Sequence, residues 1–146
     1  GAVPNEWPLS VDTIPAKAYG IRVKFIDDTI HENIKNVESF KIKYQKKITA
    51  LNIYCNNNFD STHPAGIILN DYFKIRIAVK SIYDNPENPV DINSMLDKIN
   101  TFTYDEFDLL LYKEPKSDTL YKFIVTINLS DGNKFSDSTK IVRLAI

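Results

Sequence analysis

The stretch LYKFIVTINLSDGNKF, residues 120–135, determines the fold that we expect for this 146-residue chain. Apolar and polar side chains alternate along residues 120–129, which is the period of a strand with one buried face. Asp131 and Gly132 follow, and Asp-Gly is a favoured pair in tight hairpins because glycine adopts positive φ at little cost. We predict a strand, a turn that Asp131 shapes through a side-chain-to-backbone hydrogen bond, and a return strand. The expected core face is Tyr121, Phe123, Val125, Ile127 and Leu129.

The same alternation recurs earlier in the chain and predicts further strands there. The residues expected to share a face are Tyr19, Ile21, Val23 and Phe25; Phe40, Ile42 and Tyr44; Thr49, Leu51, Ile53 and Cys55; Phe73, Ile75, Ile77 and Val79; and Phe107, Leu109 and Leu111. In the third of these strands, Ile48 is expected on the opposite face, with Ala50 and Asn52.

One stretch changes period and predicts a short helix near residues 91–100. Its apolar residues are spaced i, i+3, i+4 and i+7, which places them on one helical stripe: Ile92, Met95, Leu96 and Ile99. Asp91 or Asn93 can cap its first turn.

The order of these elements predicts a mainly β fold, an antiparallel two-layer sandwich with one short helix. Turn signals recur every ~8–15 residues, as in sandwiches, and helices do not alternate with strands as a parallel α/β fold requires. Residues 1–18 contain Pro4, Pro8 and Pro15, so we expect an extended lead there. Residues 19–146 then form a single β-sandwich domain.

Composition narrows the function class. The formal net charge is −1, which argues against a nucleic-acid binder, and the basic run 41–47 is expected to be a solvated strand or linker. The single cysteine, Cys55, excludes an intrachain disulfide and is expected to be a small buried hydrophobe. No apolar run reaches the ~18 residues of a membrane-spanning helix.

A resemblance adds to this picture. The pattern Y-x-F-x-V-x-I-x-L-S-D-G-x-x-F, residues 121–135, resembles the last strands of immunoglobulin-like modules. The opening GAVPNEWPLS and the Asn-, Lys-, Ile- and Tyr-rich composition are similar to uncharacterised exported lipoproteins of Bacteroides-type bacteria. The resemblance implies an immunoglobulin-like β-sandwich in the periplasm or on the outer-membrane surface. It also implies a lipid anchor on a cysteine that precedes this chain, so Cys55 is not that cysteine. It supplies no functional residues.

The sequence predicts no metal or cofactor site. His31 and His63 do not stand at zinc-ligand spacing, and each is expected on the surface. The loops 56–63 and 84–91 offer oxygen ligands but lack the EF-hand pattern of calcium sites.

No catalytic motif appears either. There is no G-x-S-x-G, and the proximity of Ser61 or Cys55 to His63 in sequence does not make a triad or dyad. Carboxylate groups suited by type alone to glycoside hydrolysis are Asp27 with Asp28, Asp84 with Glu87, and Asp105 with Glu106 and Asp108. We therefore predict that the protein is not an enzyme and has no catalytic residues, with a small glycan-directed hydrolase using loop carboxylates as the alternative.

The expected function is that of a non-catalytic binding or assembly module of the cell envelope. Its partner would be an envelope protein or a glycan, bound by loops on a rigid sandwich or by an edge strand. Candidate aromatic contacts are Trp7, Tyr54, Tyr72, Tyr83 and Tyr104.

Overall fold

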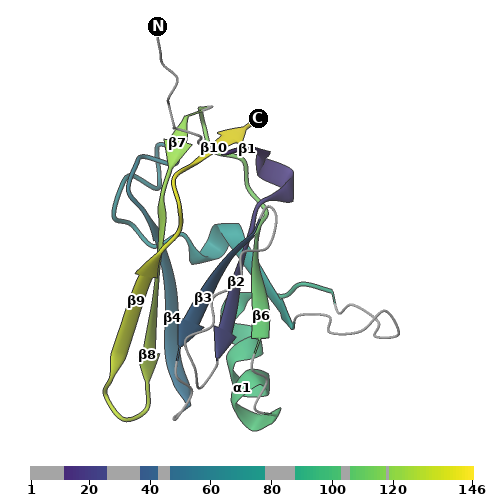
Figure 1. Ribbon diagram of the computed structural model, residues 1–146, viewed down its shortest axis with the longest axis vertical. Helices are drawn as coiled ribbons and strands as arrows, with labels where there is room; N and C mark the ends of the chain where they lie inside the picture. The colour runs from purple at the N-terminus through teal and green to yellow at the C-terminus, as the bar shows by residue number, and fades with distance from the viewer. Residues whose placement is uncertain (1–11, 26–36, 43–46, 78–87, 103–105, 118) are drawn as a thin grey trace, which may run out of the picture.

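The protein is mainly β, with three small sheets and one short α-helix in the computed structural model (Figure 1). The structure describes residues 12–25, 37–42, 47–77, 88–102, 106–117 and 119–146. Its strands are β1 (Asp12–Pro15), β2 (Gly20–Phe25), β3 (Val37–Ile42), β4 (Ile48–Cys55), β5 (Phe73–Ile77), β6 (Glu106–Leu111), β7 (Leu120–Tyr121), β8 (Phe123–Leu129), β9 (Lys134–Ser138) and β10 (Val142–Ala145). The helices are α1 (Ile92–Phe102) and two 3-10 turns, η1 (Ala16–Ala18) and η2 (Asn70–Tyr72). No helix in these ranges is long and apolar enough to cross a membrane.

The three sheets have the strand orders β1-β10-β7, β3-β2-β6-β5 and β4-β8-β9. Most pairings between described strands are antiparallel, as the sequence predicted. Two are parallel: β1 with β10, and β2 with β3. The prediction of a purely antiparallel arrangement is wrong at these two edges, because alternation along a strand does not encode the direction of its neighbour.

The hairpin β8–β9 confirms the predicted turn chemistry. The amide of Gly132 donates to the carbonyl of Leu129 at 3.0 Å, and Gly132 has a φ of 90°. Asp131 accepts a hydrogen bond from the amide of Asn133 at 2.9 Å, which fixes the turn. The predicted core face of β8 is buried in full.

One continuous hydrophobic core joins all three sheets and the helix. The aromatic ring of Phe123 on β8 lies 5.2 Å from that of Tyr19 and 5.7 Å from that of Phe73, measured between ring centroids. The predicted helical stripe is buried, and α1 packs on β4 and β5. The buried apolar faces of β2, β5 and β6 also match the predicted alternation over their described side chains.

The face expected for Ile48 is wrong. Its side chain is only 3% exposed, whereas Thr49 is exposed. The pairing of β4 with β8 shifts register between Ile48 and Ala50, and a bulge of this kind lets residues on either side of it share one face. Ile48 therefore joins Leu51 and Ile53 in the core.

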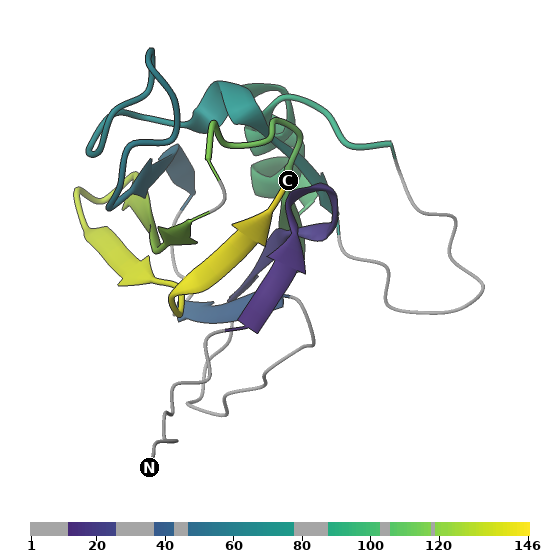
Figure 2. The same cartoon turned by 90° about the horizontal axis from the view of Figure 1, so that it is seen from above.

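Residues 12–18 of the expected lead lie against the domain. β1 pairs in parallel with β10, from Asp12 opposite Val142 to Pro15 opposite Ala145, and the two strands lie side by side in Figure 2. Ile14 and Ala16 are buried in the core. Of the residues expected in the core, the side chains of Phe25, Phe40, Ile42, Tyr44 and Val79 lie outside what the structure describes.

Candidate functional site

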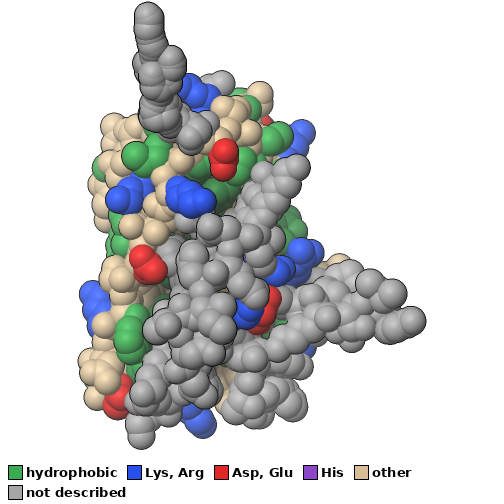
Figure 3. All heavy atoms as spheres, in the orientation of Figure 1, with side chains coloured by type: hydrophobic (Ala, Val, Ile, Leu, Met, Phe, Trp, Pro, Cys, Tyr) green, Lys and Arg blue, Asp and Glu red, His purple; other side chains and the backbone are tan. Residues whose placement is uncertain are grey.

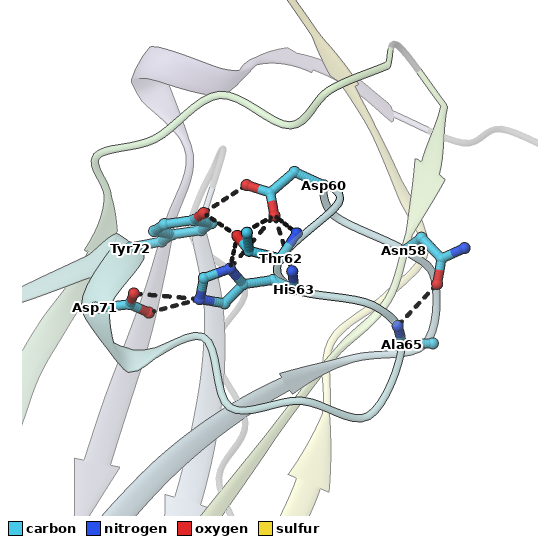
Figure 4. A network of polar contacts seen from close by, with 7 residues as sticks. All are labelled: Asn58, Asp60, Thr62, His63, Ala65, Asp71 and Tyr72. Atoms are coloured by element: carbon cyan, nitrogen blue, oxygen red, sulfur yellow. Dashed lines mark hydrogen bonds and ion pairs between the residues drawn. The ribbon is translucent and has the colours of Figure 1, made fainter.

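The segment 56–72, which joins β4 to β5, carries a compact polar network (Figure 4). Asp60 closes a turn on itself: its Oδ1 accepts hydrogen bonds from the amides of Thr62 at 3.0 Å and His63 at 2.9 Å. The hydroxyl of Thr62 donates to the same oxygen at 3.0 Å. Short polar side chains such as Asp favour this kind of local turn because they satisfy nearby backbone donors.

Tyr72 binds the other side of the same carboxylate. Its hydroxyl donates to Oδ2 of Asp60 at 2.5 Å, a link across twelve residues of sequence. The Tyr72 hydrogen bond, supported by the bonds from Thr62 and His63, holds the pKa of Asp60 well below its usual range, and the Asp60 carboxylate raises the pKa of Tyr72.

His63 lies between two acidic groups and a ring. Its Nε2 is 3.1 and 3.2 Å from the carboxylate oxygens of Asp71, and its Nδ1 is 2.8 Å from the hydroxyl of Thr62. Its ring lies 4.1 Å from that of Tyr72, between centroids. The side chain is only 13% exposed, so the expectation of a surface histidine is wrong: the turn at Asp60 directs the imidazole inward onto Tyr72.

The order Thr62, His63, Asp71 superficially matches a nucleophile, a base and an orienting acid. The backbone amides of Thr62 and His63, which could stabilise an oxyanion beside that hydroxyl, instead donate to Asp60. The network thus uses its donors to hold the loop.

The two other nucleophiles considered from the sequence are not part of this arrangement. Ser61 is exposed and makes none of the bonds of the network. Cys55 is buried, and burial raises the pKa of its thiol, which opposes formation of the nucleophilic thiolate. Cys55 is buried as predicted.

Further contacts fix the segment to the strands beneath it. Phe59 is fully buried, with its ring 5.6 Å from that of Tyr72 and 5.5 Å from that of Tyr121. Asn70 accepts a hydrogen bond from the amide of Ile53 at 2.9 Å, and its amide group donates to the carbonyl of Leu51 at 2.8 Å. The loop is therefore held by an apolar anchor and by hydrogen bonds to the backbone of β4, which also include those from the amides of Gly66 and Leu69 to the carbonyls of Cys55 and Ile53.

A cavity of about 700 Å³ lies next to this segment, between η1 and the end of β6. The two features are connected, because the amide of Tyr112 donates to the carbonyl of Tyr72 at 2.8 Å. The ammonium of Lys113 lies 5.5 Å from the centroid of the Tyr72 ring. The described lining residues are Ala16, Lys17, Ala18, Tyr19, Leu110, Leu111, Tyr112, Lys113 and Glu114.

The carboxylates of β6 are engaged in ion pairs. Nε of Arg22 lies 2.7 Å from Asp108 and 3.3 Å from Glu106, and Arg76 lies 3.5 Å from Asp108. Asp108 is 3% exposed. A carboxylate buried between two guanidinium groups is suited to structure rather than to proton transfer.

The remaining predicted candidates divide into described and undescribed residues. Tyr54 on β4 is half-buried, and Tyr72 belongs to the network above. Within the described ranges, no three side chains of the usual metal-binding types gather closely enough to hold an ion. The candidates outside those ranges are Trp7, Asp27, Asp28, His31, Tyr83, Asp84, Glu87, Tyr104 and Asp105, with most of the run 41–47.

Tyr112 was not among the aromatic candidates, although it lines the cavity and is 56% exposed. A signal for it existed: Tyr112 follows the core residue Leu111, so alternation directs it away from the core. The sequence pattern gives no comparable signal for Asp71 or for the hydrogen bond between Asp60 and Tyr72.

No protein-family model, no curated protein and no solved structure matches this chain.

Proposed function

We propose that this protein is a non-catalytic binding module of the cell envelope, with its ligand bound in the cavity between η1 and the end of β6. The observation that carries the proposal is this cavity of about 700 Å³ beside a loop fixed by its own hydrogen bonds. Small-molecule sites are typically concavities of about 300–1,000 Å³. Binding residues on loops held by a rigid scaffold lose little conformational freedom when they bind.

The same proposal includes an immunoglobulin-like sandwich. In such folds, one sheet contains the second, fifth and fourth strands, and the other contains the third, sixth and seventh. The pairings β2-β6-β5 and β4-β8-β9 follow that scheme if β3 is counted as an addition at the sheet edge and β7 is counted with β8 as one strand. The parallel pairing of β1 with β10 and the single shared core also support it.

Export and lipid anchoring rest on the resemblance of the hairpin and composition to exported lipoproteins. The test is expression of the full-length gene product with an alkyne-labelled palmitate, followed by membrane fractionation. We expect label on the protein and recovery with membranes. An unlabelled protein in the cytoplasmic fraction would contradict this part of the proposal.

Binding is tested with the purified domain against a glycan array and against cell-envelope extract with a photo-crosslinker placed at residue 114, which also lines the cavity. We expect a ligand whose binding falls when Tyr112 is replaced by Ala. Lys134→Ala, on the exposed strand β9, is the matched control and should bind as the wild type does. Equal binding by the Tyr112→Ala variant would place the ligand elsewhere.

A small hydrolase is the second candidate, because His63 lies between Thr62 and Asp71. It is less supported, since Asp60 and the backbone donors around Thr62 already satisfy one another. Chromogenic esters and glycosides test it: turnover by the wild type that disappears in His63→Ala would favour the hydrolase, and absence of turnover favours the binding module.

A further inference from the structure

The described lining of the cavity carries more basic than acidic side chains. Lys17 comes from η1 and Lys113 from the segment after β6, and both are exposed. The one acidic side chain among the described lining residues is Glu114. At the end of the molecule that carries β1 and β10, both basic and acidic side chains lie among apolar ones (Figure 3). A ligand with a negative charge fits this lining better than a neutral or cationic one.

The lining also offers an exposed aromatic ring that is held in place. Tyr112 is 56% exposed, and the ammonium of Lys74 lies 5.7 Å from its ring centroid. Lys74 is itself held by Asp91 at 3.4 Å. Ala16 and Ala18 add short side chains to the lining, so a flat ring can come close to the backbone beside Tyr112.

Two backbone donors of the cavity lining are already paired, so neither can receive a peptide added as an extra strand. The amide of Leu111 donates to the carbonyl of Tyr19 at 3.1 Å, and that of Tyr112 donates to the carbonyl of Tyr72 at 2.8 Å. Strand addition needs free backbone groups on an edge. These two donors are therefore not available to a ligand.

Building on the function proposed above, we propose that the cavity binds an acidic oligosaccharide, one whose sugar rings carry carboxylates. The apolar face of a sugar ring lies on Tyr112, and its carboxylate forms charge-assisted hydrogen bonds with Lys17 and Lys113.

The probe is tetragalacturonate, and its fully methyl-esterified form is the neutral control with the same skeleton. Titration calorimetry at low salt measures binding of both to the wild type and to four variants: Lys17→Gln, Lys113→Gln, Tyr112→Ala and Lys134→Gln. Circular dichroism and thermal melting establish that each variant folds as the wild type does. Lys134, on β9, is exposed and distant in the fold, so its variant controls for net charge.

We expect the acid to bind about tenfold or more tightly than its ester, and each cavity lysine variant to weaken acid binding by about tenfold, as loss of one charge-assisted bond predicts. The lysine variants should leave ester binding unchanged, whereas Tyr112→Ala should weaken both ligands. Lys134→Gln should change neither.

Two results would overturn the inference. If acid and ester bind equally, or a neutral glycan or a protein binds at Tyr112 in place of the acid, the acidic-sugar inference fails while the binding function stands. If no ligand of any class is affected by Tyr112→Ala, both fail.

Discussion

Strand β8 and the segment 56–72 meet in the core, but they are held by different kinds of interaction. The ring of Phe59 from the segment lies 6.4 Å from that of Phe123 on β8. β8 buries an apolar side chain at every second position, and packing supplies its stability. The segment places Phe59 and Leu69 in the core and otherwise depends on hydrogen bonds, among them those around Asp60 and Asn70. A loop can thus be stiffened without a large core, provided that each polar group finds its partner.

The largest expected effect is on the β8 side. Phe123→Ala removes a fully buried ring that contacts Tyr19 and Phe73, and should lower the free energy of unfolding by about 3–5 kcal/mol. Urea denaturation measures it. Lys122→Ala, at the neighbouring half-buried position, should change stability by less than ~0.5 kcal/mol. Similar losses of stability for both variants would mean that the buried position 123 contributes no more than the half-buried position 122.

A smaller effect is expected when the loop network is cut. Tyr72→Phe removes the hydroxyl that donates to Asp60 and should cost about 1.5 kcal/mol, the value of one hydrogen bond to a charged group. Amide hydrogen exchange should accelerate at Thr62 and His63, while β8 stays protected. Tyr54→Phe, on half-buried Tyr54, is the matched control. Faster exchange spread evenly over β8 as well would contradict the separation of the two regions.

The segment 56–72 and the turn that follows β8 each contain a glycine with positive φ, which allows a direct comparison. Gly66 has a φ of 86° and Gly132 a φ of 90°, and an added Cβ would meet no atom within 4 Å at either position. Gly66→Ala and Gly132→Ala should therefore each cost about 1 kcal/mol, from backbone strain alone. Thermal melting of the two variants side by side tests this, and a variant as stable as the wild type would show that its turn relaxes.

The last effect concerns how the stability of the protein depends on pH. Because the folded state lowers the pKa of Asp60, this group stabilises the protein above its ordinary pKa, and the stabilisation is lost as acid protonates the folded carboxylate. Denaturation curves from neutral to acidic pH should fall less steeply for Tyr72→Phe than for the wild type. Parallel curves would show that the Tyr72 bond does not set this dependence.

Where the apolar residues keep a regular period, the buried face of a strand or helix could be predicted from the sequence. β8, β6 and the stripe of α1 have the expected buried faces, because period 2 and period 3.6 record which side meets the core. The bulge between Ile48 and Ala50 could not be predicted, since one extra residue inverts the face without changing composition. The parallel partners of β2 and β10 depend on long-range pairing.

The candidate site was predicted only in pieces. The sequence drew attention to the loop 56–63, to His63 and to Tyr72, but each for a different reason. The bond between Asp60 and Tyr72 forms because η2 brings the chain back over the turn, a consequence of tertiary structure. The cavity depends likewise on η1 lying beside the end of β6, two elements far apart in sequence.

The parallel pairing of β1 with β10 has a mechanical consequence. Because the two strands run in the same direction, tension applied before Asp12 and after Ala145 pulls them along their length in opposite directions. The bonds between four facing residue pairs then share the load at once, whereas an antiparallel pair pulled from one end would open one bond at a time. This short patch therefore resists extension of the chain between its two ends.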